Sequence, residues 1–167
     1  MLILDSNVWI YIATANDFPV EIYSEHFGEP LLFFDEFLKG RRQTAVSAYM
    51  VEEIHQGIQR SERAEGEEVD DALTKFYGLM QRSEYVCNDV DQAQLEDLSL
   101  REVRQRTHNT LLAELLDIQA KDAPIFTLAY RYRFDQPHIL TDDEGFAELT
   151  PAELDISNIT IEELALT

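Results

Sequence analysis

The chain opens with a short apolar run that ends in an acid. Residues 1–4 carry no polar side chain, and Asp5 follows them directly. Such a run is typical of a strand buried on both faces of a sheet, because a half-exposed strand would alternate apolar and polar residues. From Asn7 to about Ala13 the residues favour a helix. The pattern therefore predicts that Asp5 lies at the carboxyl end of a buried first strand.

The rest of the chain alternates between apolar runs of strand length and longer stretches with apolar residues along one helical face. Strands are expected at residues 1–4, 44–47, 84–87, 138–141 and within 155–159. Helices are expected at residues 7–13, 48–60, 69–81, 91–106, 111–118 and 123–132, with a turn and a short helix over 142–149. Strands separated by helices indicate an α/β fold with a central parallel sheet of four or five strands and helices on both faces.

Glycine and proline mark two of the expected boundaries. A proline-containing connection at residues 18–20 leads to an amphipathic segment that we expect to stop as a helix near Gly40, because glycine commonly follows the last helical turn. Asp122 comes two residues before Pro124, and proline suits the first turn of a helix, where its missing N–H has no partner. We expect Asp122 to cap that helix.

Length and composition favour a single domain. The chain has 167 residues, of which 45% are hydrophobic, and this length suits one compact domain better than two. We therefore expect one domain over residues 1–167. The longest apolar run, around residues 30–34, falls far short of a membrane span. The first residues also lack the basic stretch and the cleavage site of a signal peptide. A cytoplasmic location without a membrane partner is the resulting expectation.

The balance of charges is unusual. The chain has 13 lysine and arginine residues against 33 acids, which gives a formal net charge of −20. The acids are scattered along the whole chain. This pattern resembles proteins from salt-loving archaea, because in about 1 M salt the Debye length falls to about 3 Å and surface repulsion is screened. We therefore expect the acidity to reflect a saline solvent, and it does not exclude a nucleic-acid partner if arginines gather near the site.

Four acids are expected to meet at one edge of the sheet. In an open parallel sheet, functional groups gather outside the carboxyl ends of the strands, near the point where the strand order reverses. Two of the acids follow expected strands, and two lie near the start of expected helices. The candidates are Asp5, Glu53, Asp122 and Asp143, with Asp142 as an alternative to Asp143. In a chain with 33 acids, their placement carries the prediction and their number does not.

Carboxylates gathered at such a crevice suit Mg²⁺ or Mn²⁺. These hard cations prefer oxygen ligands, and several carboxylates in one place repel each other without a counter-charge. Cys87 is the only cysteine, which excludes a zinc site built from several cysteines. On a phosphodiester, Mg²⁺ or Mn²⁺ activates a water and stabilises the leaving oxygen. The residues therefore favour metal-dependent phosphodiester hydrolysis.

Four blocks of the sequence surround the candidate acids. They are residues 2–7 around Asp5 and Asn7, residues 46–54 around Glu53, residues 122–129 around Asp122, and residues 139–146 around Thr141 and Asp143. In the first block an expected strand ends in an acid that is followed two places later by a small polar residue. In the third, apolar residues follow an acid at plus three and plus seven, and in the fourth an acid comes two residues after a threonine. In this order along the chain, the four blocks resemble those of the PIN-domain family.

The resemblance implies a metal-dependent ribonuclease, frequently the toxin of a toxin–antitoxin pair and frequently a homodimer. RNA is then the substrate, and an antitoxin protein and a second copy of the chain are the implied partners. Thr141 is implied to orient a carboxylate or a bound water, and Asn7 to support the site. The implied catalytic residues and ligands of Mg²⁺ or Mn²⁺ are Asp5, Glu53, Asp122 and Asp143.

Some positions leave alternatives open. Gly145 stands where many relatives carry another acid or an amide. This departure keeps a second function open, a PIN-like module for binding or oligomerisation with weak or no nuclease activity. Asp142 remains an alternative ligand to Asp143. Glu52 has a lower claim than Glu53, because neighbouring residues point about 100° apart around a helix.

A third class of function is a phosphatase with an aspartyl nucleophile after the first strand. That chemistry usually needs a second acid two residues later, and Asn7 stands there instead. Among the histidines, only His55 lies near a candidate acid in the sequence, and we expect it on the surface of a helix.

Arginines are the candidates for contacts with phosphate. Arginines spaced among acids on a helix more often form solvated ion pairs, and we expect this for most of them, with Arg41 and Arg42 undecided. The arginines considered are Arg41, Arg42, Arg60, Arg63, Arg101, Arg104 and Arg106.

Overall fold

The computed structural model describes residues 1–16, 21–25, 28–32, 42–82, 86–88, 90 and 95–166. Its strands are β1 (Leu2–Leu4), β2 (Glu21–Ser24), β3 (Glu29–Leu32), β4 (Thr44–Val46), β5 (Val86–Asn88), β6 (His138–Thr141) and β7 (Thr160–Glu163). Its α-helices are α1 (Ser6–Thr14), α3 (Ala48–Gln59), α4 (Glu67–Met80), α6 (Leu100–Gln105), α7 (Thr107–Leu116), α8 (Ala123–Arg131) and α9 (Glu144–Ala147). Short 3₁₀ helices cover Arg133–Asp135 and Pro151–Leu154.

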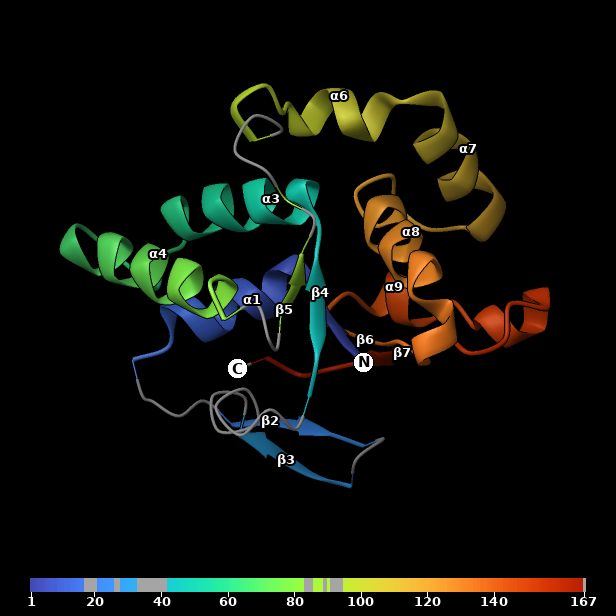
Figure 1. Ribbon diagram of the computed structural model, residues 1–167, viewed down its shortest axis with the longest axis horizontal. Coiled ribbons are helices and arrows are strands. Elements are labelled where there is room, and N and C mark those ends of the chain that lie inside the picture. The colour runs from blue at the N-terminus through green and yellow to red at the C-terminus, as the bar shows by residue number, and fades with distance from the viewer. Residues whose placement is uncertain are drawn as a thin grey trace.

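Five strands form a parallel sheet through the middle of the protein (Figure 1). Their order is β5-β4-β1-β6-β7, and every neighbouring pair runs parallel. In register, Leu2 of β1 lies beside Thr44 on one side and beside His138 on the other. In Figure 1, α1, α3 and α4 lie on one side of the sheet, and α8 and α9 lie on the other. The predicted α/β fold with a parallel sheet and helices on both faces is confirmed.

The strand order reverses at β1. After β1 the chain adds β4 and β5 to one side of the sheet, and β6 and β7 to the other side only later. In such a sheet, the residues that follow the central strands meet at a common edge. Asp5 follows β1, Ser47 follows β4 and residues 142–143 follow β6. The fold therefore brings distant segments together at the edge where the sequence predicts the acids.

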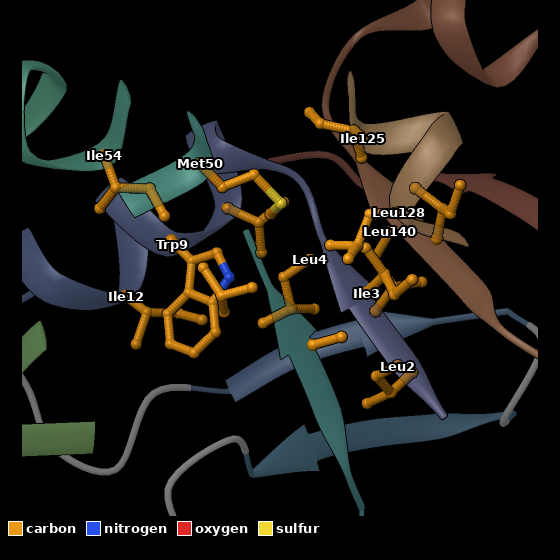
Figure 2. Packing of buried hydrophobic residues seen from close by; sticks show 14 of the residues in the cluster. Leu2, Ile3, Leu4, Trp9, Ile12, Met50, Ile54, Ile125, Leu128 and Leu140 are labelled. Atoms are coloured by element: carbon orange, nitrogen blue, oxygen red, sulfur yellow. The ribbon is translucent and has the colours of Figure 1, made fainter. Parts of the chain in front are cut away.

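Alternate residues of β1 face the two halves of the core (Figure 2). Leu4 points toward Trp9 and Met50, which come from α1 and α3. Ile3 points to the other side, toward Leu128 of α8. All five side chains are at most 4% exposed. Burial of such a side chain contributes about 1.5 to 3 kcal/mol, so β1 is anchored on both faces as its apolar run predicts.

A glycine sets the distance between α1 and α3. A Cβ atom on Gly57 would overlap the side chain of Ile10, so the two helices can lie this close only without one. Nearby, Trp9 meets Phe76 of α4 edge-on, with ring centroids 5.6 Å apart, a geometry that aromatic rings favour. The close contact holds α3, which carries Glu53, against the helix that begins directly after Asp5.

Part of the amphipathic segment before Gly40 is a hairpin. β2 and β3 pair antiparallel, with Ile22 beside Leu31. Side chains along β2 alternate between exposed and buried, which is the period of a strand covered on one face. The expectation of a helix is therefore wrong for residues 21–25 and 28–32. Residues 18–20 and 33–41, which include Gly40, lie outside the described residues.

The hairpin is attached to the edge strand of the main sheet. Glu162 of β7 accepts a hydrogen bond from the Ser24 hydroxyl at 2.9 Å and another from the N–H of Glu25 at 2.5 Å. The same carboxylate lies 2.7 Å from Nε2 of His138 on β6. One acidic side chain thus connects two sheets that share no strand.

The last strand lies further along the chain than predicted. β7 covers Thr160–Glu163 and pairs with β6, whereas the sequence predicts a strand within residues 155–159. Asp155 and Asn158 have φ values of 59° and 78°. These left-handed conformations do not fit an extended strand, so the strand begins only after Asn158.

The helix expected over residues 91–106 is interrupted. Residues 98–99 are not helical, and the Ser99 hydroxyl accepts a hydrogen bond from the N–H of Glu102, so it caps a new helix, α6. Residues 91–94 lie outside the described residues. Within the described part of the chain α4 is the longest helix, with 14 residues, and no helix there has the length and apolar character needed to cross a membrane.

Candidate functional site

Two hydrogen bonds hold the carboxylate of Asp5 at the end of β1. Oγ1 of Thr141 donates to Oδ2 at 2.6 Å, and the N–H of Ser6 donates to Oδ1 at 2.6 Å. The Thr141 hydroxyl in turn accepts from the N–H of Asp143 at 3.0 Å, which fixes the direction of its own proton. Asp5 is 3% exposed, and burial raises the pKa of its carboxyl to about 6, with a further contribution from the charge of Glu53.

Asp122 precedes α8 but does not cap it with its side chain. A carboxylate at this position normally accepts from the N–H of the second or third helical residue. Here the second residue is Pro124, which has no N–H, and the N–H of Ile125 donates to the main-chain oxygen of Asp122 at 3.1 Å. Asp122 thus occupies the predicted N-cap position, but its side chain makes no capping hydrogen bond. Asp122 is 2% exposed, and its Oδ2 has no hydrogen-bond partner among the described residues.

The buried carboxyl of Asp122 lies in an acidic environment. Burial raises its pKa to about 7, and Lys121 acts in the opposite direction. The charges of Asp5, Asp143 and Glu53 raise the pKa further. Ionising a buried carboxyl beside other acids is costly, because burial removes much of the hydration that stabilises the charge. A proton or a bound cation would remove this cost.

A tyrosine and an arginine hold Glu53. Its Oε2 accepts from Nη2 of Arg104 at 2.5 Å and lies 2.9 Å from the hydroxyl of Tyr49. This hydroxyl accepts from Nε of Arg104 at 2.8 Å and lies 3.1 Å from the main-chain oxygen of Lys121. Since a hydroxyl has one proton, Tyr49 donates either to Glu53 or to Lys121 at any moment. Burial, together with the charge of Glu53, raises the pKa of Tyr49, so the proton stays on the tyrosine.

Asp143 is tied to a lysine and to a helix. Its Oδ2 accepts from Nζ of Lys121 at 2.9 Å, and its Oδ1 accepts from the N–H of Phe146 at 3.2 Å as the N-cap of α9. The Lys121 hydrogen bond lowers the pKa of Asp143, which keeps this carboxylate ionised. Asp142, by contrast, is exposed. A Cβ on Gly145 would lie 3.3 Å from Oδ1 of Asp143, so the glycine leaves room for this cap.

Most of the predicted side chains share one cavity of about 660 Å³. Its wall includes the predicted residues Asp5, Asn7, Glu53 and Asp122, and the basic residues Arg60, Arg101, Arg104 and Lys121. Asp143 is not part of this wall, but it accepts a hydrogen bond from Lys121, which is. The edge of the sheet therefore brings together three of the four predicted acids, and the fourth is linked to them through a lysine.

The acids do not form a ready-made set of metal ligands in this conformation. Within the described part of the chain, no group of three or more histidine, cysteine, aspartate or glutamate side chains is arranged to hold a metal ion. Arg104 and Lys121 instead lie among the acids, each paired with one carboxylate. The donors are nevertheless oxygens, which Mg²⁺ and Mn²⁺ prefer, and Asp122 offers one without a partner. By their chemistry the residues fit a divalent cation, provided that a neighbouring cation moves aside.

Comparisons with protein families, curated proteins and solved structures find no match. The likeness to PIN domains therefore stays a prediction drawn from the four sequence blocks. Function has to be argued from the site itself, and its two most informative features are the unpartnered oxygen of Asp122 and the pairing of Glu53 with Arg104.

The sequence does not predict the roles that three residues have at the site. These residues are Tyr49, Arg104 and Lys121. Tyr49 comes four residues before Glu53 on α3, a spacing that places two side chains on one helix face and is readable in the sequence. Arg104 is expected to pair with an acid near it in the sequence, and it pairs instead with Glu53, at a separation of 51 residues. No local pattern indicates such a contact.

Other residues near the site have structural contacts. Glu52 accepts from Nε2 of Gln56 at 2.8 Å and is not part of the cavity wall, in line with its lower claim. Nδ1 of His55 lies 2.7 Å from the hydroxyl of Tyr77, so this histidine links α3 to α4. Arg41, undecided from the sequence, lies outside the described residues.

Proposed function

We propose that this protein is a divalent-metal-dependent endoribonuclease of the PIN-domain type. The observation that carries the proposal is the Asp122 carboxylate, which is 2% exposed, lines the cavity and has an oxygen without a hydrogen-bond partner among the described residues. A buried polar group of this kind is costly unless a ligand completes it. Because Asp5 and Glu53 line the same cavity, the ligand that fits best is a small cation with more than one charge.

The side chains have separate tasks in this proposal. A bound Mg²⁺ or Mn²⁺ supplies an activated water and offsets the charge of the scissile phosphodiester. Thr141 keeps Oδ2 of Asp5 in one orientation through its hydrogen bond. Asn7 offers an amide at the cavity wall. Asp142 remains the alternative to Asp143, and its exposure makes it the weaker choice. The cation would be held by Asp5, Glu53, Asp122 and Asp143.

An anionic substrate needs positive charge at the site, because the whole chain carries a net charge of −20. Basic side chains gather at this cavity: Arg60, Arg101, Arg104 and Lys121. This grouping supports a phosphodiester substrate. The choice of RNA, and the search for an antitoxin protein or a second copy of the chain as partner, rest on the sequence resemblance to PIN domains.

The test combines binding of Mn²⁺, measured by isothermal titration calorimetry, with cleavage of a single-stranded RNA in molar KCl. The wild-type protein is expected to bind Mn²⁺ and to cut the RNA only when the cation is present. Asp122→Asn and Asp5→Asn should lose both properties while their circular dichroism stays that of a folded protein. Glu52→Gln is the matched control, since Glu52 neighbours Glu53 and is not part of the cavity wall.

Two results would overturn the proposal. One is a folded wild-type protein that does not bind Mn²⁺ at millimolar concentration. The other is cleavage that persists at full rate in Asp122→Asn, because the activity would then come from a contaminant or from another site. Asp142→Asn and Asp143→Asn, measured side by side, identify the fourth ligand as the one whose loss weakens Mn²⁺ binding more.

A second candidate function is a PIN-like module for binding or oligomerisation with weak or no nuclease activity. The observation in its favour is that Arg104 and Lys121 already pair with Glu53 and Asp143. A site neutralised in this way is stable without a metal ion. This alternative predicts no Mn²⁺ binding together with a stable dimer or a captured partner protein, which sedimentation analysis of the purified protein and of the protein isolated from its host would detect.

A further inference from the structure

Arg104 bridges two walls of the cavity. It comes from α6, which lies beside α3 (Figure 1), and its Nη2 and Nε reach Glu53 and Tyr49 on α3 at 2.5 and 2.8 Å. Its guanidinium carbon also lies 5.7 Å from the centre of the Tyr49 ring. The Arg104 side chain is 36% exposed, whereas that of Glu53 is 16% exposed. The arginine therefore sits at the mouth of the site, with solvent on one side and the acids on the other.

Arg104 and a divalent cation would compete for one oxygen of Glu53. Oε2 accepts from Arg104 and also lies within hydrogen-bond distance of Tyr49. A divalent cation that uses this carboxylate has to compete with the guanidinium for it. Tyr49 makes the competition more severe, because its hydroxyl accepts from Nε and so holds the guanidinium in position.

Arg104 has an alternative partner of suitable chemistry. A guanidinium presents parallel N–H groups that match the oxygens of a phosphate, and Arg104 lines the cavity that a phosphodiester would enter. In a chain with a net charge of −20, a phosphate approaches more readily when a cation is released near it. Release from Glu53 would provide such a cation at the mouth of the site.

We propose that Arg104 couples the binding of the divalent cation to the binding of the phosphodiester. It pairs with Glu53 when neither ligand is present and turns to the phosphate when the cation takes Glu53. This inference rests on the proposed function, since it needs a cation at the carboxylates. Either ligand, when it binds alone, has to break the ion pair between Arg104 and Glu53. When both ligands bind, the ion pair is broken only once, so the second ligand binds without this cost.

The coupling is reciprocal. By thermodynamic linkage, the factor by which the phosphodiester strengthens cation binding equals the factor by which the cation strengthens phosphodiester binding. The pair formed by Arg104 and Glu53 is partly exposed. For a partly exposed ion pair we expect its contribution to the coupling to be about twofold to fivefold.

The first measurement is the affinity of the metal-free protein for Mn²⁺ alone, by isothermal titration calorimetry. Arg104→Gln is expected to bind Mn²⁺ about twofold to fivefold more tightly than the wild type, because the competing cation is gone. Arg106→Gln is the matched control. Arg106 directly follows α6, is exposed and is not part of the cavity wall, so its loss removes one charge without freeing Glu53. A change below about twofold is expected for the control.

The second measurement is the affinity for a single-stranded 2′-O-methyl RNA oligonucleotide, by fluorescence anisotropy, with Mn²⁺ and with chelator. Gel electrophoresis verifies that the oligonucleotide stays intact. In the wild type, Mn²⁺ should strengthen oligonucleotide binding. In Arg104→Gln this strengthening should be smaller by about twofold to fivefold, since Mn²⁺ still attracts phosphate directly but no longer releases the guanidinium.

The outcomes separate the inference from the proposed function. If Mn²⁺ binds to the wild type and to Arg104→Gln equally well, the inference fails and the proposed function stands. If neither protein binds Mn²⁺ although both are folded, the proposed function fails as well. Tyr49→Phe replaces Arg104→Gln if that variant does not fold. It removes the hydroxyl that accepts from Nε and is expected to tighten Mn²⁺ binding by a smaller factor, and unchanged affinity overturns the inference.

Discussion

Thr141 and Asp5 are joined by a hydrogen bond across 136 residues of sequence, at a distance of 2.6 Å. Both residues are at most 3% exposed. The bond crosses from the end of β6 to the residue after β1, the two strands that lie side by side in the middle of the sheet. A single hydroxyl thus fixes the orientation of the first acid of the candidate site.

Replacing this hydroxyl should weaken both the fold and the site. Thr141→Val keeps the shape of the side chain, but Asp5 loses a donor and the N–H of Asp143 loses an acceptor. We expect the free energy of unfolding, measured with urea, to fall by about 1 to 3 kcal/mol. Thr160→Val, the same substitution at an exposed position of β7, should change it by less than about 0.5 kcal/mol. Equal effects of the two substitutions would contradict this role of Thr141.

The stability of the metal-free protein should depend on pH through Asp5 and Asp122. Their pKa values in the folded protein are about 6 and about 7, above the ordinary value of about 3.9 for aspartate. The folded state therefore binds these protons more tightly than the unfolded state does. The resulting stability is fully present below about pH 4 and is lost as the pH rises through about 6 to 7.

A substitution isolates this effect from the titration of the other acids. Asp122→Asn cannot ionise, so in chelator its free energy of unfolding should exceed that of the wild type increasingly between pH 5 and pH 8. We expect a difference on the order of a few kcal/mol at pH 8. Asp142→Asn, at an exposed neighbour of Asp143, should show a difference that changes little with pH. An Asp122→Asn difference that is constant over this range would disprove the raised pKa.

The contact between α1 and α3 depends on a glycine. Gly57→Ala should lower the free energy of unfolding by about 1 to 3 kcal/mol, because the new methyl group overlaps the side chain of Ile10. Gly78→Ala is the matched control in α4, where a Cβ meets no atom within 4 Å, and it should stabilise the protein by about 0.5 to 1 kcal/mol. Ile10→Val removes part of the obstacle, so the double variant with Gly57→Ala should recover part of the loss.

Salt should stabilise the protein strongly. With a net charge of −20, the folded chain repels itself in dilute buffer, and molar KCl shortens the Debye length to about 3 Å. We expect the midpoint of thermal unfolding to rise steadily from 10 mM to 2 M KCl. Equimolar sucrose at low ionic strength serves as the control for general solute effects. Full stability in dilute buffer would contradict a saline origin for the acidic composition.

The sequence predicts the central sheet well because its strands are buried and bounded by helices. The apolar run at residues 1–4 and the run at 138–141 form neighbouring strands, and the acids that follow them lie at the predicted edge. The hairpin at residues 21–32 is less visible. Its alternation covers only a few residues per strand, too few to separate it from a helical pattern.

The parts of the site that the sequence does not reveal are its long-range contacts. Arg104 shares its own helix with one acid, Glu102, yet it pairs with Glu53 on another helix. The unpartnered oxygen of Asp122 depends on Pro124 and on the burial of the whole helix start. Such features follow from the packing of several elements at once, and no spacing within one element predicts them.

The bond between Asp5 and Thr141 also bears on the order in which the chain is synthesised. Asp5 leaves the ribosome before Thr141 and Asp143, which follow only after more than a hundred further residues. Until β6 has emerged, β1 has β4 as a neighbour on one side only, and Asp5 lacks the hydroxyl that orients it. A nascent chain therefore cannot complete the acidic edge of the sheet until residues 138–143 have been added, so this site is among the last parts of the fold to form.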